Sequence, residues 1–258
     1  MNKINKLFLE RGDHRLLSLY FCAGTPTLES TADVLRAMQR RGIDFVEVGI
    51  PFSDPLADGP VIQTAATHAL RNGMSVAKLF QQLKAVKDEI TMPLILMGYL
   101  NPILHFGLER FCQQCQEAGV SGMIIPDLPF NDYLEQLKPV ADRYDLRVIM
   151  LITPETSEER IRFIDDHTDG FIYMVSSAST TGAQQAFDEQ KQDYFRRIDA
   201  MQLRNPRMIG FGISNRQTLE SAQQHAAGAI IGSKFVSLLE EEKDPEKALD
   251  RLFKALSD

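Results

Sequence analysis

A glutamate at position 47 stands inside an otherwise apolar run, FVEVG at residues 45–49. Side chains alternate between the two faces of a strand, so Phe45, Glu47 and Gly49 share one face, which we expect to point inward. Burial disfavours the charged form of a carboxylate and leaves a carboxyl group able to give and take protons. We therefore predict an acid and base role for Glu47. A buried structural glutamate paired with a lysine or arginine is the alternative.

Two aspartates follow in a proline-rich segment, PFSDPLADGP at residues 51–60. Its three prolines restrict the backbone and make the segment stiff enough to hold a carboxylate in one place. Asp54 lies in Ser-Asp-Pro, a sequence typical of a turn, so Asp58 is the better candidate for chemistry. An Asp-Gly pair is also common in turns, and a structural role for Asp58 stays open.

Two glycine-containing turns, GFGIS at 210–214 and IIGSKF at 230–235, each end an apolar run and precede a helical pattern. Backbone amides at the start of a helix bind phosphate, and glycine lets the backbone come close to it. Gly212 and Gly232 would provide that approach, and Ser233 would add a hydroxyl. These features predict a phosphate site, with plain tight turns as the alternative.

A third segment, SSASTTGAQ at residues 176–184, is small, polar and without apolar anchors. Such a composition is typical of a mobile lid over an active site, or of a disordered surface loop. Metal and serine-hydrolase chemistry lack support, because the five histidines show no ligand spacing and no G-x-S-x-G motif occurs. Cys112 and Cys115 form an isolated C-x-x-C inside a helical pattern, which indicates two ordinary helix positions.

These candidates need a scaffold, and the chain contains eight short apolar runs separated by helical patterns. Runs without clean alternation are typical of parallel strands that are covered on both faces. Eight β/α units predict an α/β protein, a single (β/α)8 TIM barrel over residues 1–258, with a doubly wound open sheet as the alternative. The predicted strands are Leu17–Ala23, Phe45–Ile50, Leu94–Tyr99, Gly122–Pro126, Val148–Ile152, Phe171–Val175, Met208–Phe211 and Ala229–Gly232.

Segments outside the regular repeat carry further expectations. An amphipathic N-terminal helix, with Ile4, Leu7 and Phe8 on one face, precedes the first predicted strand. Two intervals between strands are longer than most others, and the excess lies in Pro51–Met74 and Ser176–Asp188. Both follow the carboxyl end of a strand, where barrel enzymes keep their chemistry, so we predict long functional loops after strands 2 and 6.

Helix boundaries have signals of their own. Glycines that follow helical patterns favour a left-handed terminal residue, and serine or threonine before such a pattern favours an N-terminal cap. The signals predict left-handed glycines at Gly42, Gly119 and Gly228, and caps at Thr27, Thr156 and Ser214.

Composition limits the partners of the chain. It has 28 basic and 35 acidic residues, a net charge of −7, and no basic cluster, so we expect neither nucleic acid nor an anionic membrane as a partner. No stretch approaches the roughly 18 apolar residues of a membrane span, and the first residues lack the features of a secretion signal. Three cysteines argue against a disulfide framework and for a cytoplasmic location.

These segments together resemble one family. VEVGIPFSDPLADGPVIQ at residues 46–63 is similar to the signature of the tryptophan synthase alpha subunit family. The resemblance continues in chain order through MGYLNP (97–102), IIPDLP (124–129), STTGA (179–183), GFGIS and IGSKFV. It implies a TIM barrel that cleaves indole-3-glycerol phosphate to indole and glyceraldehyde 3-phosphate. It also implies an α2β2 complex, in which indole passes to a pyridoxal-phosphate-dependent beta subunit.

The resemblance also implies residue roles. It places the acid/base glutamate of the family on Glu47 and the second catalytic carboxylate on Asp58. The other matches are substrate-binding positions: Tyr20, Met97 and Leu128 in the indole pocket, Tyr173 at the reacting centre, Gly182, Gly212, Gly232 and Ser233 at the phosphate, and Thr181 in the lid, where it meets the second carboxylate. The sequence departs from the family pattern at Tyr20, where phenylalanine is commoner, and in the lid, which lacks a basic residue that some members carry before it.

Elementary chemistry agrees with this resemblance. Breaking the bond between indole C3 and the glycerol chain is a retro-aldol step, for which we expect no metal, nicotinamide or other cofactor. It needs a proton on C3, a base for the side-chain hydroxyl and stabilisation of positive charge at the indole nitrogen. The apolar strand favours a protonatable Glu47, and the polar loop favours an ionised Asp58.

A further expectation concerns the partner. The segment Pro51–Met74 and the loop Leu100–His105, with a stiff turn at Asn101–Pro102, are predicted to dock the beta subunit.

Two alternative functions are weighed against this one. Another phosphate-handling barrel, such as a sugar-phosphate isomerase, has no reason to carry PFSDPLADGP. A catalytically idle scaffold that only activates a beta subunit would have lost Glu47 or Asp58, and both are present.

Overall fold

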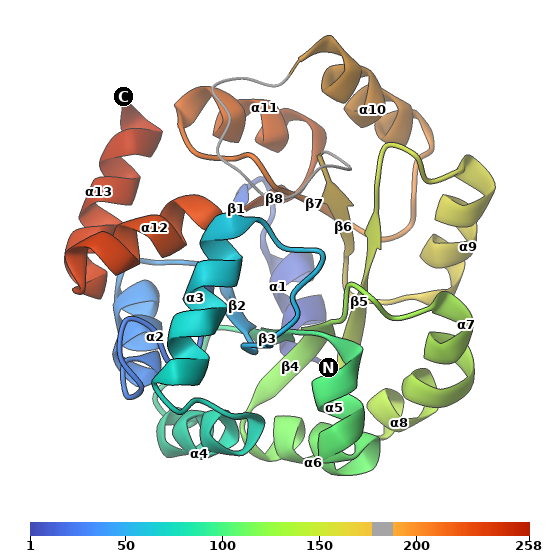
Figure 1. Ribbon diagram of the computed structural model, residues 1–258. Coiled ribbons are helices and arrows are strands. Elements are labelled where there is room, and N and C mark those ends of the chain that lie inside the picture. The colour runs from blue at the N-terminus through green and yellow to red at the C-terminus, as the bar shows by residue number, and fades with distance from the viewer. Residues whose placement is uncertain (177–187) are drawn as a thin grey trace.

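The computed structural model describes residues 1–176 and 188–258, and its strands close into a barrel (Figure 1). Each strand pairs in parallel with the next, and β8 returns to pair with β1. This closed order confirms the predicted TIM barrel and excludes the open sheet, whose edge strands would stay unpaired. The strands are β1 (Leu16–Cys22), β2 (Phe45–Gly49), β3 (Leu94–Met97), β4 (Val120–Ile124), β5 (Arg147–Ile152), β6 (Ile172–Val175), β7 (Arg207–Gly210) and β8 (Gly228–Ile231).

Helices surround the barrel, with one or more after each strand (Figure 1). Within residues 1–176 and 188–258, none is long and apolar enough to cross a membrane. They are α1 (Lys3–Glu10), α2 (Thr31–Arg40), α3 (Pro60–Arg71), α4 (Val76–Val86), α5 (Leu100–Phe106), α6 (Leu108–Glu117), α7 (Phe130–Asp132), the π-helical turn η1 (Tyr133–Leu137), α8 (Lys138–Arg143), α9 (Glu158–His167), α10 (Glu189–Ala200), α11 (Arg216–His225), α12 (Ser233–Glu242) and α13 (Pro245–Ser257).

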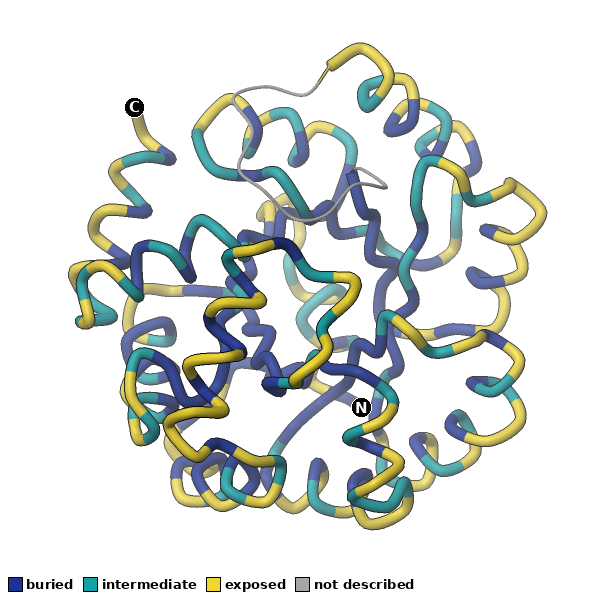
Figure 2. Tube along the Cα trace, in the orientation of Figure 1, coloured by how far each residue is buried: buried dark blue, intermediate teal, exposed yellow. Residues whose placement is uncertain are grey.

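Two apolar clusters hold these layers together. The larger one lies between the outer faces of the strands and the helices. In Figure 2 the strands of the barrel are mostly dark blue, the colour of buried residues. The smaller one fills the barrel itself and includes Phe45, Ile95, Ile124, Ile149 and Phe171. Because both faces of every strand are covered, the strands read as apolar runs in the sequence rather than as alternating patterns.

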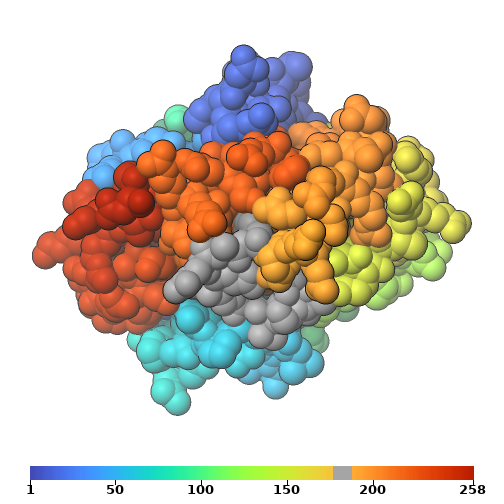
Figure 3. Space-filling view, turned by 90° about the horizontal axis from the view of Figure 1, so that it is seen from above, coloured from blue at the N-terminus to red at the C-terminus, as the bar shows by residue number. Residues whose placement is uncertain are grey.

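The predicted amphipathic helix is present as α1, and it closes the amino end of the barrel. Ile4 is buried among the interior residues, and the ring of Phe8 lies 5.4 Å from that of Phe171. The Asn2 side chain caps α1 by accepting a hydrogen bond from the amide of Ile4. In Figure 3, α1 projects from one end of the barrel, opposite the segment around residues 50–75.

The predicted helix caps are each displaced by one to three residues. The helix α2 begins after Ser30 rather than Thr27, and Ser157 caps α9 in place of Thr156. Asn215, not Ser214, caps α11, where it forms a reciprocal capping box with Thr218. Neighbouring Ser, Thr and Asn residues all have capping side chains, so a sequence pattern does not choose between them.

Two of the three predicted left-handed glycines are confirmed. Gly42 and Gly119 have φ values of 74° and 75° where α2 and α6 end. The prediction for Gly228 is wrong, because this residue begins β8 instead of ending a helix. A Cβ atom on Gly228 would lie only 2.1 Å from the carbonyl oxygen of Leu16, so glycine is needed there for the close approach of β1.

The predicted long loops differ in detail from the structure. The excess after β2, Pro51–Met74, contains the whole of α3, so only residues 51–59 and the short turn at 72–74 are irregular. The predicted loop Leu100–His105 is helix α5, with Asn101 and Pro102 in its first turn, where proline is tolerated. The predicted lid after β6, at residues 176–184, lies outside the described residues from Ser177 onward.

Candidate active site

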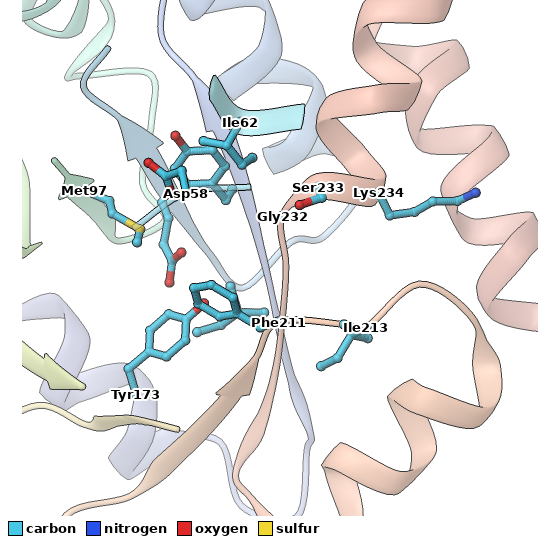
Figure 4. Close-up of a pocket in the computed structure, with 13 residues that line it drawn as sticks. Asp58, Ile62, Met97, Tyr173, Phe211, Ile213, Gly232, Ser233 and Lys234 are labelled. Carbon is cyan, nitrogen blue, oxygen red and sulfur yellow. The ribbon is translucent and has the colours of Figure 1, made fainter. Parts of the chain in front are cut away.

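A hollow opens at the carboxyl ends of the strands and brings together most of the predicted site residues (Figure 4). Strands β1, β2, β3 and β6, the segment before α3 and the starts of the last two β/α turns all contribute to its wall. The predicted residues that line it are Tyr20, Glu47, Asp58, Met97, Tyr173, Gly212, Gly232 and Ser233.

The Glu47 carboxyl group is buried in this hollow without a hydrogen-bond partner. Glu47 lies in β2 between Tyr20 of β1 and Ile95 of β3, and only 1% of the residue is exposed. Neither carboxylate oxygen has a hydrogen-bond partner in the part of the chain that the structure describes, so the predicted alternative of a structural ion pair is not observed there. Burial raises the pKa of Glu47 to about 8.

Tyr99 holds Asp58 in place. Its hydroxyl donates a hydrogen bond of 2.8 Å to Oδ2 of Asp58 and accepts one of 3.0 Å from the amide of Ala57. The ring of Tyr99 also packs on Phe52, at 5.3 Å between ring centres. Tyr99, which lies between β3 and α5, therefore contacts three residues of the segment that follows β2: Phe52, Ala57 and Asp58.

The surroundings of Asp58 are less polar than the sequence predicts. Burial raises the pKa of Asp58 above its usual range, and the hydrogen bond from Tyr99 opposes this shift only in part. Asp54, by contrast, is exposed, and its carbonyl accepts a hydrogen bond from the Leu56 amide at 2.9 Å. Asp54 is thus part of a turn, as predicted, and Asp58 is the carboxylate that faces the hollow.

Two tyrosines face the interior, the half-buried Tyr20 of β1 and the buried Tyr173 of β6. The hydroxyl of Tyr20 occupies the space that a side chain on Gly49 would need, and Tyr173 stands in the same relation to Gly210. A Cβ atom on either glycine would lie 2.1 Å from the tyrosine oxygen. Burial raises the pKa of both tyrosines, so they stay protonated hydrogen-bond donors.

The other side of the hollow consists of backbone at the ends of β7 and β8. Phe211 and Gly212 both have positive φ values, 69° and 81°, and the Phe211 carbonyl accepts a hydrogen bond from the Ser176 hydroxyl. Gly232 immediately precedes α12, which begins at Ser233 as predicted. The first amides of a helix have no partner within it, so this edge suits an anion. In Figure 4 the Lys234 side chain points away from Asp58.

Sequence reasoning missed several residues of this site and misplaced one. Phe211 stands between the glycines of GFGIS, and Tyr99 lies in MGYLNP, but neither residue has a role predicted from the sequence. Leu128 is not in the wall: it lines a separate hollow with Phe130 and Arg160. Thr181 and Gly182 lie outside the described residues. The missed residues of the wall are Ile62, Phe211, Ile213, Ile230 and Lys234.

The described part of the chain contains no candidate metal site. Residues 1–176 and 188–258 contain no group of three or more His, Cys, Asp or Glu side chains placed to hold an ion. Cys112 and Cys115 are free thiols buried on α6, which agrees with their prediction as ordinary helix positions.

Comparison with known proteins gives a consistent result. The sequence model of one family, described as "Tryptophan synthase alpha chain", matches residues 9–257. Proteins of that name from Bacteroides fragilis and Phocaeicola vulgatus are 64% and 63% identical, over 98% and 99% of this chain and 95% and 99% of their own lengths. A crystal structure of tryptophan synthase subunit alpha from Legionella pneumophila has a TM-score of 0.88 at 33% identity, covering 99% of this chain and 97% of its own.

Burial of Glu47 predicts a pH-dependent stability. Because its folded pKa is raised, the folded chain holds one more proton than the unfolded chain between about pH 4.5 and 8. The free energy of unfolding therefore falls by about 1.4 kcal/mol per pH unit over this window and levels off above it. Glu47→Gln, which cannot ionise, should lack this slope when urea unfolding is measured from pH 5 to pH 9.

An exposed glutamate provides the control. Glu135→Gln makes the same substitution on the surface of η1 and should leave the slope of the wild type unchanged. Parallel curves for wild type and Glu47→Gln over this range would mean that Glu47 is not held in its protonated form by burial.

Proposed function

Because this chain belongs to the tryptophan synthase alpha chain family, we propose a role in the reaction of that family for each polar group of the hollow. The chain is a lyase that cleaves indole-3-glycerol phosphate to indole and glyceraldehyde 3-phosphate, and it works with a beta subunit that uses the indole. One observation carries the assignment of residues: Glu47 is a buried, unpaired carboxyl group whose pKa lies near neutrality.

Glu47 is proposed as the proton shuttle. It donates a proton to indole C3, which places positive charge on the indole nitrogen, and its carboxylate then takes the proton of the side-chain hydroxyl. The C–O bond of that hydroxyl becomes a carbonyl as the bond to C3 breaks, and the electron pair returns to the ring as indole. A carboxyl group with a pKa of about 8 is suited to both transfers, because it gains and loses protons near neutral pH.

Asp58 is proposed to accept the indole N–H. A carboxylate there stabilises the positive charge that develops on the nitrogen when C3 is protonated. The hydrogen bond from Tyr99 supports this role, since it favours the charged form of Asp58 and fixes the direction of its carboxylate. Tyr99 is therefore a positioning residue, which acts on the substrate through Asp58.

The remaining residues of the wall are assigned to the two ends of the substrate, the indole ring and the phosphate. Tyr20, Met97 and Tyr173 are proposed to surround the indole ring, because their side chains lie in the hollow with the two carboxyl groups. The phosphate is proposed to lie at Gly212, Gly232 and Ser233, where helix amides and a hydroxyl are available. From the sequence alone, Thr181 and Gly182 join this set.

The beta subunit is proposed to dock on the face that surrounds the hollow. Leu56, in the segment before α3, is 88% exposed, and Leu104 of α5 is 52% exposed. Both segments directly follow a strand, so both apolar side chains lie at the carboxyl end of the barrel. A partner there would cover them and seal the exit through which an apolar indole would otherwise be lost.

The cytoplasm is the proposed location of the chain. All three cysteines are free thiols, which suits a reducing compartment. Cell fractionation that recovered the chain with secreted proteins would contradict this proposal.

The proton shuttle is tested by substitution at position 47. Glu47→Gln keeps the size of the side chain but cannot transfer a proton, so kcat for indole release should fall by about 10²–10⁴-fold with folding intact. Steady-state kinetics of wild type, Glu47→Gln and the surface control Glu135→Gln make the measurement. A Glu47→Gln chain that releases indole at nearly the wild-type rate would remove Glu47 from the mechanism.

The phosphate site is tested at the start of α12. Ser233→Ala should weaken substrate binding by about 1–2 kcal/mol, seen as a higher KM with little change in kcat, because the contact exists in both ground and transition states. Ser237→Ala, one turn further along the same helix, is the matched control and should leave KM unchanged. If KM is also unchanged in Ser233→Ala, the hydroxyl of Ser233 does not bind the phosphate.

The docking face is tested with a charge at its exposed leucine. Leu104→Asp should lower the affinity for the beta subunit at least tenfold while leaving the slow indole release of the isolated chain unchanged. Leu9→Asp is the matched control, since Leu9 is 73% exposed on α1 at the opposite end of the barrel. Calorimetric titration with the beta subunit measures both variants, and equal affinities would place the interface elsewhere.

A further inference from the structure

A second hollow, of about 530 Å³, lies at the amino end of the barrel. Its wall comes from α1, α10 and α11, from residues just before β1, β6, β7 and β8, and from the start of β7. The proposed catalytic hollow is at the carboxyl ends of the same strands, so the two lie at opposite ends of the barrel. We call this second one the amino-end hollow, and its charged residues of interest are Arg11, Arg15, Arg204, Arg207, Asp199 and His225.

Three arginines of the amino-end hollow have no acidic partner. Within residues 1–176 and 188–258, no carboxylate forms an ion pair with Arg11, Arg15 or Arg204. Each guanidinium group is instead held by backbone carbonyls, which fix its position without cancelling its charge. The contacts run from Arg11 to His14 at 3.1 Å, from Arg15 to Ala226 at 3.1 Å, and from Arg204 to Asp165 and Thr168 at 2.7 Å each.

The carboxylates that line the amino-end hollow are already neutralised. Asp199 pairs with Arg207 at 2.9 Å and contacts the His225 ring at 2.8 Å. Asp169 pairs with Arg147 at 3.1 Å. The hollow therefore keeps the charges of three arginines in a chain whose net charge is −7. A chain with a negative net charge does not attract anions in general, so this local excess of positive charge is a property of the hollow itself.

Arg207 adds an independent observation. Its Nε–H is buried and has no hydrogen-bond acceptor in the part of the chain that the structure describes. Buried donors in folded proteins nearly always have an acceptor, and Arg207 lines the hollow, so a small shift of its side chain would present this donor to acceptor oxygens of a ligand.

We propose that the amino-end hollow binds a small phosphorylated metabolite with at least two anionic groups. Guanidinium groups match the geometry of phosphate oxygens, and three uncompensated charges suit a ligand with more than one negative group. The volume is within the range of small-molecule sites and exceeds the needs of a single phosphate ion. This site does not depend on the proposed roles at the other end of the barrel.

Pyrophosphate is the probe for the experiment. Calorimetric titration of the full chain should detect one binding event that Arg15→Gln/Arg204→Gln weakens at least tenfold. Arg71→Gln/Arg110→Gln removes the same charge outside the hollow and should leave the affinity unchanged. Indole release by Arg15→Gln/Arg204→Gln should match the wild type, which verifies folding. Both arginines are exposed, so their loss is tolerated.

Two further measurements locate the site and define its ligand. The ring signal of His225 in an NMR spectrum should move on addition of pyrophosphate, and Ser233→Ala should leave the binding event unchanged. Inorganic phosphate should bind at least tenfold more weakly than pyrophosphate. Equal affinity in Arg15→Gln/Arg204→Gln and wild type, loss of binding in Ser233→Ala, or equal affinities for the two probes would each overturn the proposal.

Discussion

Burial of one carboxyl group without a partner is the constraint around which this barrel is organised. Strands β1 and β3 pair with β2 on either side and hold Glu47 in the interior, where no described residue compensates a negative charge. The protonated form is favoured, and the free energy of unfolding therefore falls as the pH rises from about 4.5 to 8. Such a group is useful only where a substrate reaches it, and the hollow at the carboxyl ends of the strands provides that access.

The two ends of the barrel differ: one end is closed by packing, and the other holds the proposed catalytic groups. The helix α1 and the interior phenylalanines close one end of the barrel, so the strands meet the hollow only at the other end. Glycines in β2 and β7 make room for Tyr20 and Tyr173, and Tyr99 fixes the segment that carries Asp58. The two carboxyl groups thus differ in kind: Glu47 has no partner, and Asp58 has a hydrogen-bond donor.

The sequence predicts the barrel and the chemical residues better than the details that place them. Glu47 is recognisable because a charge in an apolar run has few structural explanations, and glycines mark the turns after β7 and β8. Caps are displaced because adjacent polar residues compete for the same helix end. Tyr99 is not predictable, since its contact with Asp58 exists only once two chain segments have folded together. Leu128 lies outside the catalytic hollow for a similar reason: the direction of its side chain depends on how the turn after β4 folds.

Direct titration of the Glu47 carboxyl tests the central claim. In carbon-13 NMR spectra of the chain labelled at glutamate side-chain carboxyls, one signal, missing from Glu47→Gln, should titrate with a midpoint of about pH 8. A midpoint near the ordinary value of about 4.5 would contradict the account, because Glu47 would then be ionised at neutral pH and would hold no proton to give to indole.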